Sequence, residues 1–184
     1  RGVESRTRWV HQELVAAGVP CLAFVNKLDR PTADYDRVAE QMAEELDVRI
    51  APLVVPLHDR ERFVGIADAA RGLHLLFESA PEPDPAYLEL RREQLVEVLA
   101  ALDPELFEAV CEDRPLEQGQ LLRSLQRSTR SRRVVPLLCG SALHNRGVEP
   151  LLDMVCGLLP PPAPGPELAE GGAQALVVRA EPVD

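Results

Sequence analysis

Two short polar segments follow apolar runs, and they carry the side chains with the clearest potential for chemistry. The first is Asn-Lys-Leu-Asp at 26–29, directly after the apolar run 21–25. The second is Ser-Ala-Leu at 141–143, which follows the apolar run 134–139. A short continuous apolar run is typical of a parallel strand that is buried on both faces. Because ligands of open α/β sheets bind outside the carboxyl ends of the strands, the two segments are expected to meet at one site.

The residue types favour guanine as the ligand. The Asp29 carboxylate can accept hydrogen bonds from the N1 hydrogen and the exocyclic amino group, which only guanine presents side by side. The backbone N–H of Ala142 can donate to guanine O6, at a position where adenine carries an amino group. Adenine would leave Asp29 opposite an acceptor, and unpaired buried polar groups are a source of large selectivity.

The other members of the two segments have supporting roles in this hypothesis. Asn26 either contacts the N7 and O6 side of the base or ties the neighbouring loops together. The alkyl stem of Lys27 can cover the face of the base, and Ser141 braces the loop or Asp29 through its hydroxyl. An Asn-Lys-x-Asp pattern arises by chance in roughly one chain in fifty of this length, so alone it also fits a solvated turn. The second strand-end loop makes the guanine site the favoured interpretation.

The elements that must position these loops follow an α/β pattern, which is interrupted by a block of different texture. Helical spacing predicts helices over 6–17, from 35 onward and over 147–159, around the two buried strands, and Asp34 is the predicted cap of the second helix. The intervening block is predicted as an α+β insertion, with strands at 49–57, 63–67 and 73–77 followed by three helices. Pro52 and Pro56 cannot donate to a ladder, which places the strand 49–57 at an edge.

Composition excludes several classes of protein. The 184 residues include 20 Lys plus Arg and 30 Asp plus Glu, a net charge of −10, which argues against a free-standing nucleic-acid binder. The 46% hydrophobic content argues against general disorder, and no apolar stretch is long enough to span a membrane. The spacing of the four cysteines fits neither a metal site nor a disulfide framework, and it favours free thiols in a reducing cytoplasm.

Five segments of the chain resemble elongation factor G, a translational GTPase: 2–4, 25–30, 63–68, 138–143 and 145–153. The resemblance runs from Arg1 to about Pro162 and includes the subdomain that this family inserts between its two guanine loops. It implies an α/β fold in which a partial P-loop NTPase-type parallel sheet carries an α+β insertion subdomain. The implied divisions are the first part of the GTPase domain (1–48), the insertion (49–132), the last strand and helix (133–159), a Pro-rich linker (160–172) and the start of a β domain (173–184).

The resemblance also implies a function. GTP or GDP would be bound through Asn26, Lys27, Asp29, Ser141, Ala142 and Leu143, in a monomeric, cytoplasmic factor without a membrane partner. The intact factor would use GTP hydrolysis to drive translocation on the ribosome, through contacts with rRNA and stalk proteins. The alternatives are the ribosome-recycling paralogue, release factor 3, a ribosomal protection protein, or a ribosome-binding module without enzymatic activity.

Some features of the family pattern are altered or absent. Pro31-Thr32 stand where the family usually has Thr-Gly, and the insertion is shorter than usual around 77–84. The chain contains no G-x-x-x-x-G-K-[ST] phosphate loop and no catalytic His beside a D-x-x-G segment. In the family these elements and the Mg²⁺ ligands lie upstream of the position of Arg1. We therefore expect this chain to hold neither catalytic nor metal-binding residues, and to be inactive alone.

Two weaker features have alternative interpretations. The basic cluster Arg123–Arg133 is either a solvated helix face that pairs with nearby acids or a patch that approaches ribosomal RNA or a stalk protein. His144 follows the second loop and replaces a Lys of the family. We expect it to be exposed rather than catalytic.

Overall fold

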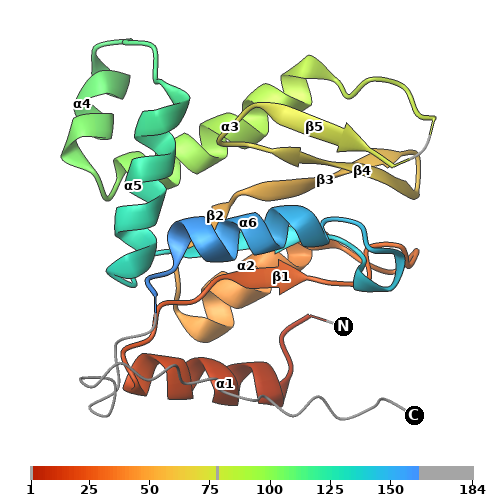
Figure 1. Ribbon diagram of the computed structural model, residues 1–184, viewed down its shortest axis with the longest axis horizontal. Helices are drawn as coiled ribbons and strands as arrows, with labels where there is room; N and C mark the ends of the chain where they lie inside the picture. The colour runs from red at the N-terminus through yellow and green to blue at the C-terminus, as the bar shows by residue number, and fades with distance from the viewer. Residues whose placement is uncertain (1, 78, 162–184) are drawn as a thin grey trace, which may run out of the picture.

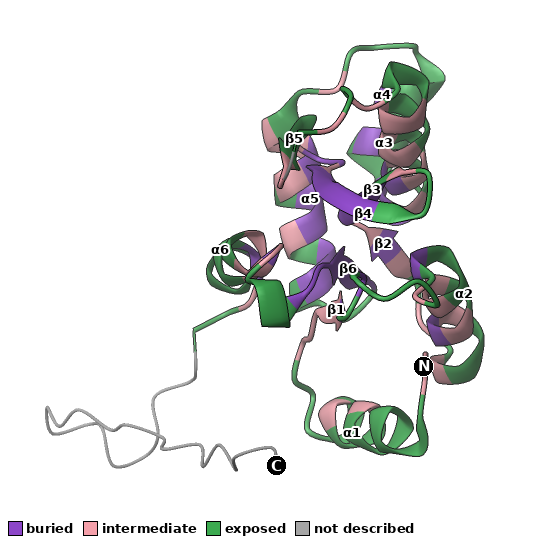
Figure 2. Cartoon of the chain, turned by 90° about the vertical axis from the view of Figure 1, so that its right-hand side faces the viewer, coloured by how far each residue is buried: buried purple, intermediate pink, exposed green. Residues whose placement is uncertain are grey.

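Three parallel strands form the sheet that carries the two polar loops. In this computed structural model, which describes residues 2–77 and 79–161, the order is β1 (Ala23–Val25), β6 (Val135–Cys139) and β2 (Ile50–Pro52). All five residues of the central strand β6 are buried. Helices α2 (Tyr35–Leu46) and α6 (Val148–Leu158) cover opposite faces of this sheet (Figures 1 and 2). The predicted α/β class and parallel sheet are confirmed.

The helices next to the sheet begin at residues that suit helix starts. The Asp34 carboxylate accepts a hydrogen bond of 3.0 Å from the Arg37 backbone N–H, which caps α2 as predicted.

Helix α1 (Ser5–Ala16) buries none of its residues and lies apart from the strands in Figure 1. Trp9 on this helix is 60% exposed.

An antiparallel sheet with three helices is inserted between β2 and β6. Its strands β3 (Val54–Asp59), β4 (Arg62–Asp68) and β5 (Leu73–Leu76) pair in sequence order. Helices α3 (Pro85–Ala100), α4 (Pro104–Cys111) and α5 (Gln118–Arg130) follow them along the chain. Figure 1 shows this α+β unit on one side of the parallel sheet, and one continuous set of buried side chains joins the two parts.

The single strand predicted over 49–57 is wrong, because this segment divides between the two sheets. Its first part, β2, pairs with β6 in the parallel sheet, and its second part, β3, pairs with β4 in the insertion. Leu53 lies between them and is fully buried. Its N–H donates to Leu137 O at 3.0 Å and its carbonyl accepts from Ala69 N at 2.9 Å. Both parts are edge strands of their sheets among the described residues, as their prolines require.

Two arginines of the basic cluster Arg123–Arg133 have structural partners. Arg127 pairs with the buried carboxylate of Asp103 at 2.5 Å, where Asp103 also caps α4. The Arg130 Nε donates to Leu158 O at 3.2 Å and thereby satisfies a carbonyl at the end of α6. The Arg127 pair agrees with the interpretation that the cluster pairs with nearby acids, whereas Arg130 contacts a backbone carbonyl of α6. The predicted contact of the cluster with RNA or a stalk protein stays a prediction.

Several further expectations concern the whole chain. Cys21, Cys111, Cys139 and Cys156 are free thiols, and Cys139 is fully buried. Within residues 2–77 and 79–161, no helix is long and apolar enough to cross a bilayer, and no cluster of three or more potential metal ligands occurs. The start of a β domain predicted at 173–184 and nearly all of the linker predicted at 160–172 lie outside the described residues.

Candidate functional site

The register of the parallel sheet brings the two polar loops together. Val25 at the end of β1 is paired with Cys139 at the end of β6, so the next residues of both strands lie side by side. The ladder continues into the loops, since Gly140 N donates to Val25 O at 3.0 Å and Leu28 N donates to Gly140 O at 3.1 Å. The two predicted segments therefore form one surface at the carboxyl edge of the sheet.

Asn26 ties the two loops to each other. Its side-chain oxygen Oδ1 accepts hydrogen bonds from the Ala142 backbone N–H at 3.0 Å and from the Lys27 backbone N–H at 2.8 Å. Of the two roles considered for Asn26, the structure contains the loop tether. The Ala142 N–H that we expect to reach guanine O6 thus has Asn26 as its partner here. For guanine O6 to accept a hydrogen bond from the Ala142 N–H, this N–H must either share its hydrogen bond with Asn26 Oδ1 or release Asn26 Oδ1.

The first loop turns sharply after the tether. Lys27 has a φ of +67°, a left-handed conformation that costs a non-glycine residue free energy and is concentrated at functional sites. Leu28 is only 3% exposed and anchors the loop in the core, while Lys27 is exposed. With Leu28 directed inward, the flanking polar residues Lys27 and Asp29 are presented at the edge of the sheet.

The second loop is closed by a pair of backbone hydrogen bonds. Ser141 N donates to Arg146 O and Arg146 N donates to Ser141 O, both at 2.9 Å, around a short 3₁₀ turn at Ala142–His144. Leu143 at the tip of this turn is 84% exposed. An apolar side chain in the open next to the tethered Ala142 suits contact with the flat face of a base.

The environment of Asp29 keeps its carboxylate ionised. The nearby Ser141 hydroxyl is the largest cause that lowers the pKa of Asp29 below its ordinary value of 3.8, and partial burial opposes this effect. The Ser141 Oγ is buried and makes no hydrogen bond of standard length in the structure. His144 Nε2 lies 3.9 Å from Asp29 Oδ2 and contributes less. The Asp29 carboxylate is therefore ionised at neutral pH, and its side chain, which is 21% exposed, can accept hydrogen bonds from a ligand.

All six predicted site residues lie on these two adjoining loops. Sequence reasoning did not identify Gly140, whose missing side chain leaves room for Arg146 O and the Phe24 ring, or Arg146, which closes the second loop. A Gly directly after a buried strand is a sequence signal for close backbone approach. The contact between His144 and Asp29 depends on how the loops pair, and no local pattern indicates it.

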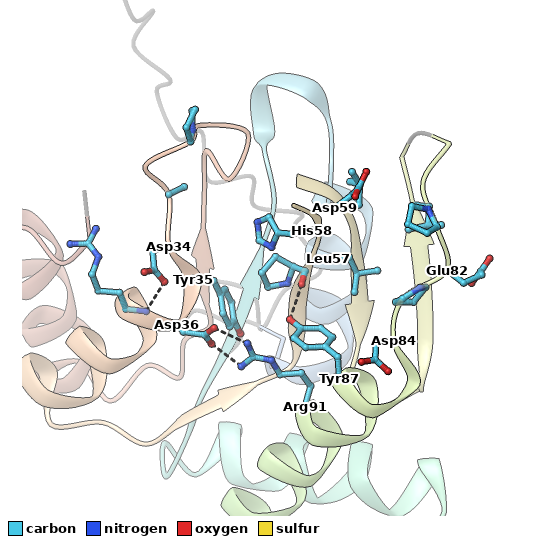
Figure 3. Close-up of a pocket in the computed structure, with 18 of the residues that line it drawn as sticks. Asp34, Tyr35, Asp36, Leu57, His58, Asp59, Glu82, Asp84, Tyr87 and Arg91 are labelled. Carbon is cyan, nitrogen blue, oxygen red and sulfur yellow. Dashed lines mark hydrogen bonds and ion pairs between the residues drawn. The ribbon is translucent and has the colours of Figure 1, made fainter. Parts of the chain in front are cut away.

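A pocket of about 570 Å³ lies beside the first loop, at the junction with the insertion (Figure 3). Five carboxylates line it, but each already has a partner. Asp34 and Asp84 cap helices, and the other three are paired with arginine or histidine side chains: Asp36 with Arg91, Asp59 with Arg62, and Glu82 with His74. The acidic lining is therefore accounted for by the structure itself, and we interpret this pocket as a seam between the two parts.

The ion pair in this seam fastens the insertion to helix α2. Arg91 is bidentate to Asp36, with both N–O distances at 2.7 Å, and its guanidinium carbon lies 5.0 Å from the centre of the Tyr87 ring (Figure 3). We expect Arg91→Ala to lower the free energy of unfolding by about 1–2 kcal/mol, because the Arg91 side chain is only 12% exposed. Urea denaturation of the 184-residue chain measures this loss. Arg114→Ala is the control, since its exposed ion pairs should contribute less than about 0.5 kcal/mol. Equal losses in both variants would contradict a fastening role for Arg91.

Comparison with known proteins identifies the family. Residues 1–161 match the family described as the elongation factor Tu GTP binding domain. The chain belongs to this family. It is 34% identical over 172 residues to elongation factor G 2 of Syntrophus aciditrophicus (strain SB). The aligned region covers 88% of this chain and 25% of the relative. It is also 34% identical over 178 residues to the mitochondrial elongation factor G of Drosophila mojavensis, which covers 91% of this chain and 24% of that relative.

The fold agrees with these matches. The crystal structure of ttk003000868 from Thermus thermophilus superposes with a TM-score of 0.75 at 25% identity, covering 86% of this chain and 25% of the other. The resemblance to elongation factor G that the sequence motifs predicted is therefore confirmed. The chain spans about a quarter of the length of the curated relatives it matches.

Proposed function

We propose that this chain is the guanine-recognising part of a ribosome-associated GTPase that resembles elongation factor G and drives translocation in protein synthesis. The observation that carries the proposal is the Asn26 tether, which holds the Ala142 amide in the loop beside the ionised Asp29 carboxylate. The Asp29 carboxylate is an acceptor for N1 and N2 of guanine, and the Ala142 N–H on the adjoining loop becomes a donor for O6 when it shares or exchanges Asn26 Oδ1. GTP and GDP are thus the proposed ligands of Asn26, Lys27, Asp29, Ser141, Ala142 and Leu143.

The remaining parts of the reaction are assigned to a longer factor that contains this chain. The sequence holds no G-x-x-x-x-G-K-[ST] segment, so this chain has no group of that kind to bind the β- and γ-phosphates. Mg²⁺ binding, attack by water and contacts with ribosomal RNA and stalk proteins belong to the proposal for the intact, cytoplasmic factor. The chain's own contribution is the choice of base.

Nucleotide competition in the intact factor tests the proposal. We expect GDP to displace a fluorescent guanine nucleotide at least about a hundredfold more effectively than ADP, because adenine leaves the Asp29 carboxylate without a donor. We also expect ribosomes to stimulate GTP hydrolysis. Equal competition by ADP would contradict guanine recognition. Guanine binding without hydrolysis would favour the alternative of a ribosome-binding module that is not an enzyme.

The protonation of Asp29 gives a test on the 184-residue chain itself. Its pKa is lowered, so the ionised form and the stability it contributes are present above pH 3.8 and are lost as the pH falls through the lower folded-state pKa. Guanine affinity should therefore be insensitive to Asp29 titration around neutral pH. In carboxyl ¹³C NMR, Ser141→Ala should raise the Asp29 pKa toward its ordinary value, and His144→Ala should raise it less. A larger effect of His144→Ala would contradict the assigned order of causes.

A further inference from the structure

Arg146 connects the second loop of the site to the inserted subdomain. Its backbone closes the loop through the two hydrogen bonds with Ser141, as described above. Its side chain is directed away from the loop. The Nη1 atom donates to Phe63 O of β4 at 3.4 Å, and the guanidinium carbon lies 5.2 Å from the centre of the Phe77 ring. One residue therefore contacts the Ser141 backbone of the loop and two aromatic residues of the insertion.

The insertion offers a fixed platform for this side chain. The rings of Phe63 and Phe77 are 5.4 Å apart in an edge-to-face arrangement, and Phe63 is only 5% exposed. Phe77 follows β5, and its N–H donates to Val64 O at 2.8 Å, which holds its backbone against β4. Movement of the β4–β5 edge would therefore displace Arg146.

The backbone on either side of Arg146 has little freedom to absorb such a movement. Asn145 and Gly147 both have positive φ angles, +53° and +79°. A Cβ atom at Gly147 would lie 2.4 Å from Cys139 O, and one at Gly140 would lie 2.1 Å from Arg146 O. The loop is thus packed against the end of β6, so a shift of Arg146 is transmitted to Ser141 and Ala142.

We infer that Arg146 is a positioning residue through which the inserted subdomain holds the O6-binding loop and sets the rate of guanine nucleotide release. This inference rests on the proposed function. Arg146 has no assigned contact with the base, and it acts by fixing Ala142 relative to Asp29. The contacts of Arg146 with Phe63 and Phe77 are the ones that join the second loop to the insertion.

The experiment measures dissociation of GDP and of inosine diphosphate, which lacks the 2-amino group, from the intact factor. Arg146→Ala should release GDP about three- to tenfold faster, the range expected for loss of a half-buried cation–π and hydrogen-bond contact. The ratio of GDP to inosine diphosphate affinity should not change, because both bases carry O6 and the Asp29 contact to the amino group is untouched. Arg146→Lys should restore part of the slow release, since the positive charge is retained. Arg71→Ala, which removes an ion pair inside the insertion, should change release less than about twofold.

A double-mutant cycle tests the route of the coupling. Phe77→Leu should accelerate release by itself but add little to Arg146→Ala, because both changes remove the same contact. Additive effects, or release from Arg146→Ala at the wild-type rate, would overturn the inference. If the wild-type factor fails to prefer GDP to ADP, the proposed function fails instead. The two failures are therefore distinguishable.

The 184-residue chain provides a second readout that needs no nucleotide. In Arg146→Ala, backbone hydrogen exchange at Ala142 should become faster, because the Ala142 N–H is protected by Asn26 only while the loop is held in place. Exchange in the core strand β6 should stay as in the wild type. Unchanged exchange at Ala142 would contradict the positioning role, and so would faster exchange throughout the chain, which would show a general loss of stability instead.

Discussion

Asp29→Asn is expected to change the base preference of the intact factor from guanine to xanthine. The substitution keeps the size of the side chain but replaces one acceptor oxygen by an amide N–H donor. This donor opposes the 2-amino group of guanine, so affinity for GDP should fall by about 3 kcal/mol, roughly a hundredfold or more. Xanthine carries a carbonyl at position 2 and retains its N1 hydrogen, so it matches the acceptor and donor of Asn. Competition between GDP and xanthosine diphosphate measures the ratio.

The control for this variant removes the same charge elsewhere. Asp153 is exposed on α6, and Asp153→Asn should leave the GDP-to-xanthosine diphosphate ratio unchanged. A general electrostatic effect of the lost carboxylate would appear in both variants. An Asp29→Asn factor that still prefers GDP by the wild-type ratio would contradict the assignment of Asp29 to the base.

Local patterns in the sequence were sufficient to predict the helices and strands that surround the site. The Asp34 cap and the apolar run that becomes β6 are features of a few neighbouring residues, and the structure follows them. The two polar segments were also located correctly at strand ends. Their proximity followed from a general property of parallel sheets rather than from any specific contact.

The predictions that were wrong, and the alternatives that stayed open, concern contacts between residues that lie far apart in the sequence. The segment 49–57 is largely apolar, and nothing within it signals that β2 pairs with β6 while β3 pairs with β4. Asn26 could have faced either the base or the second loop, because the choice depends on the register between Val25 and Cys139. The basic cluster in the sequence does not indicate that Arg130 donates a hydrogen bond to Leu158 O. In each case the deciding contact joins segments that are distant in the sequence.

Gly140→Ala is expected to disrupt the site through lack of space. The φ of Gly140 is not in the left-handed region, so backbone strain is not the reason. A Cβ atom there would lie 2.1 Å from Arg146 O and 2.8 Å from the Phe24 ring, and Arg146 O is the acceptor that closes the second loop. Relief of this overlap must move either the loop or β1. We expect a loss of about 1–3 kcal/mol in the free energy of unfolding, measured by urea denaturation of the whole chain.

Gly157→Ala supplies the matched comparison, because the same methyl group is added where it meets no atom within 4 Å. Gly157 lies inside α6, where alanine is a better helix former, so this variant should gain up to about 1 kcal/mol. The two substitutions should therefore change stability in opposite directions. In the intact factor, Gly140→Ala should also weaken GDP binding, since opening the loop separates Ala142 from Asn26 and Asp29. If Gly140→Ala unfolds at the wild-type urea concentration and binds GDP normally, the close approach of Gly140 to Arg146 O is not what holds the second loop in place.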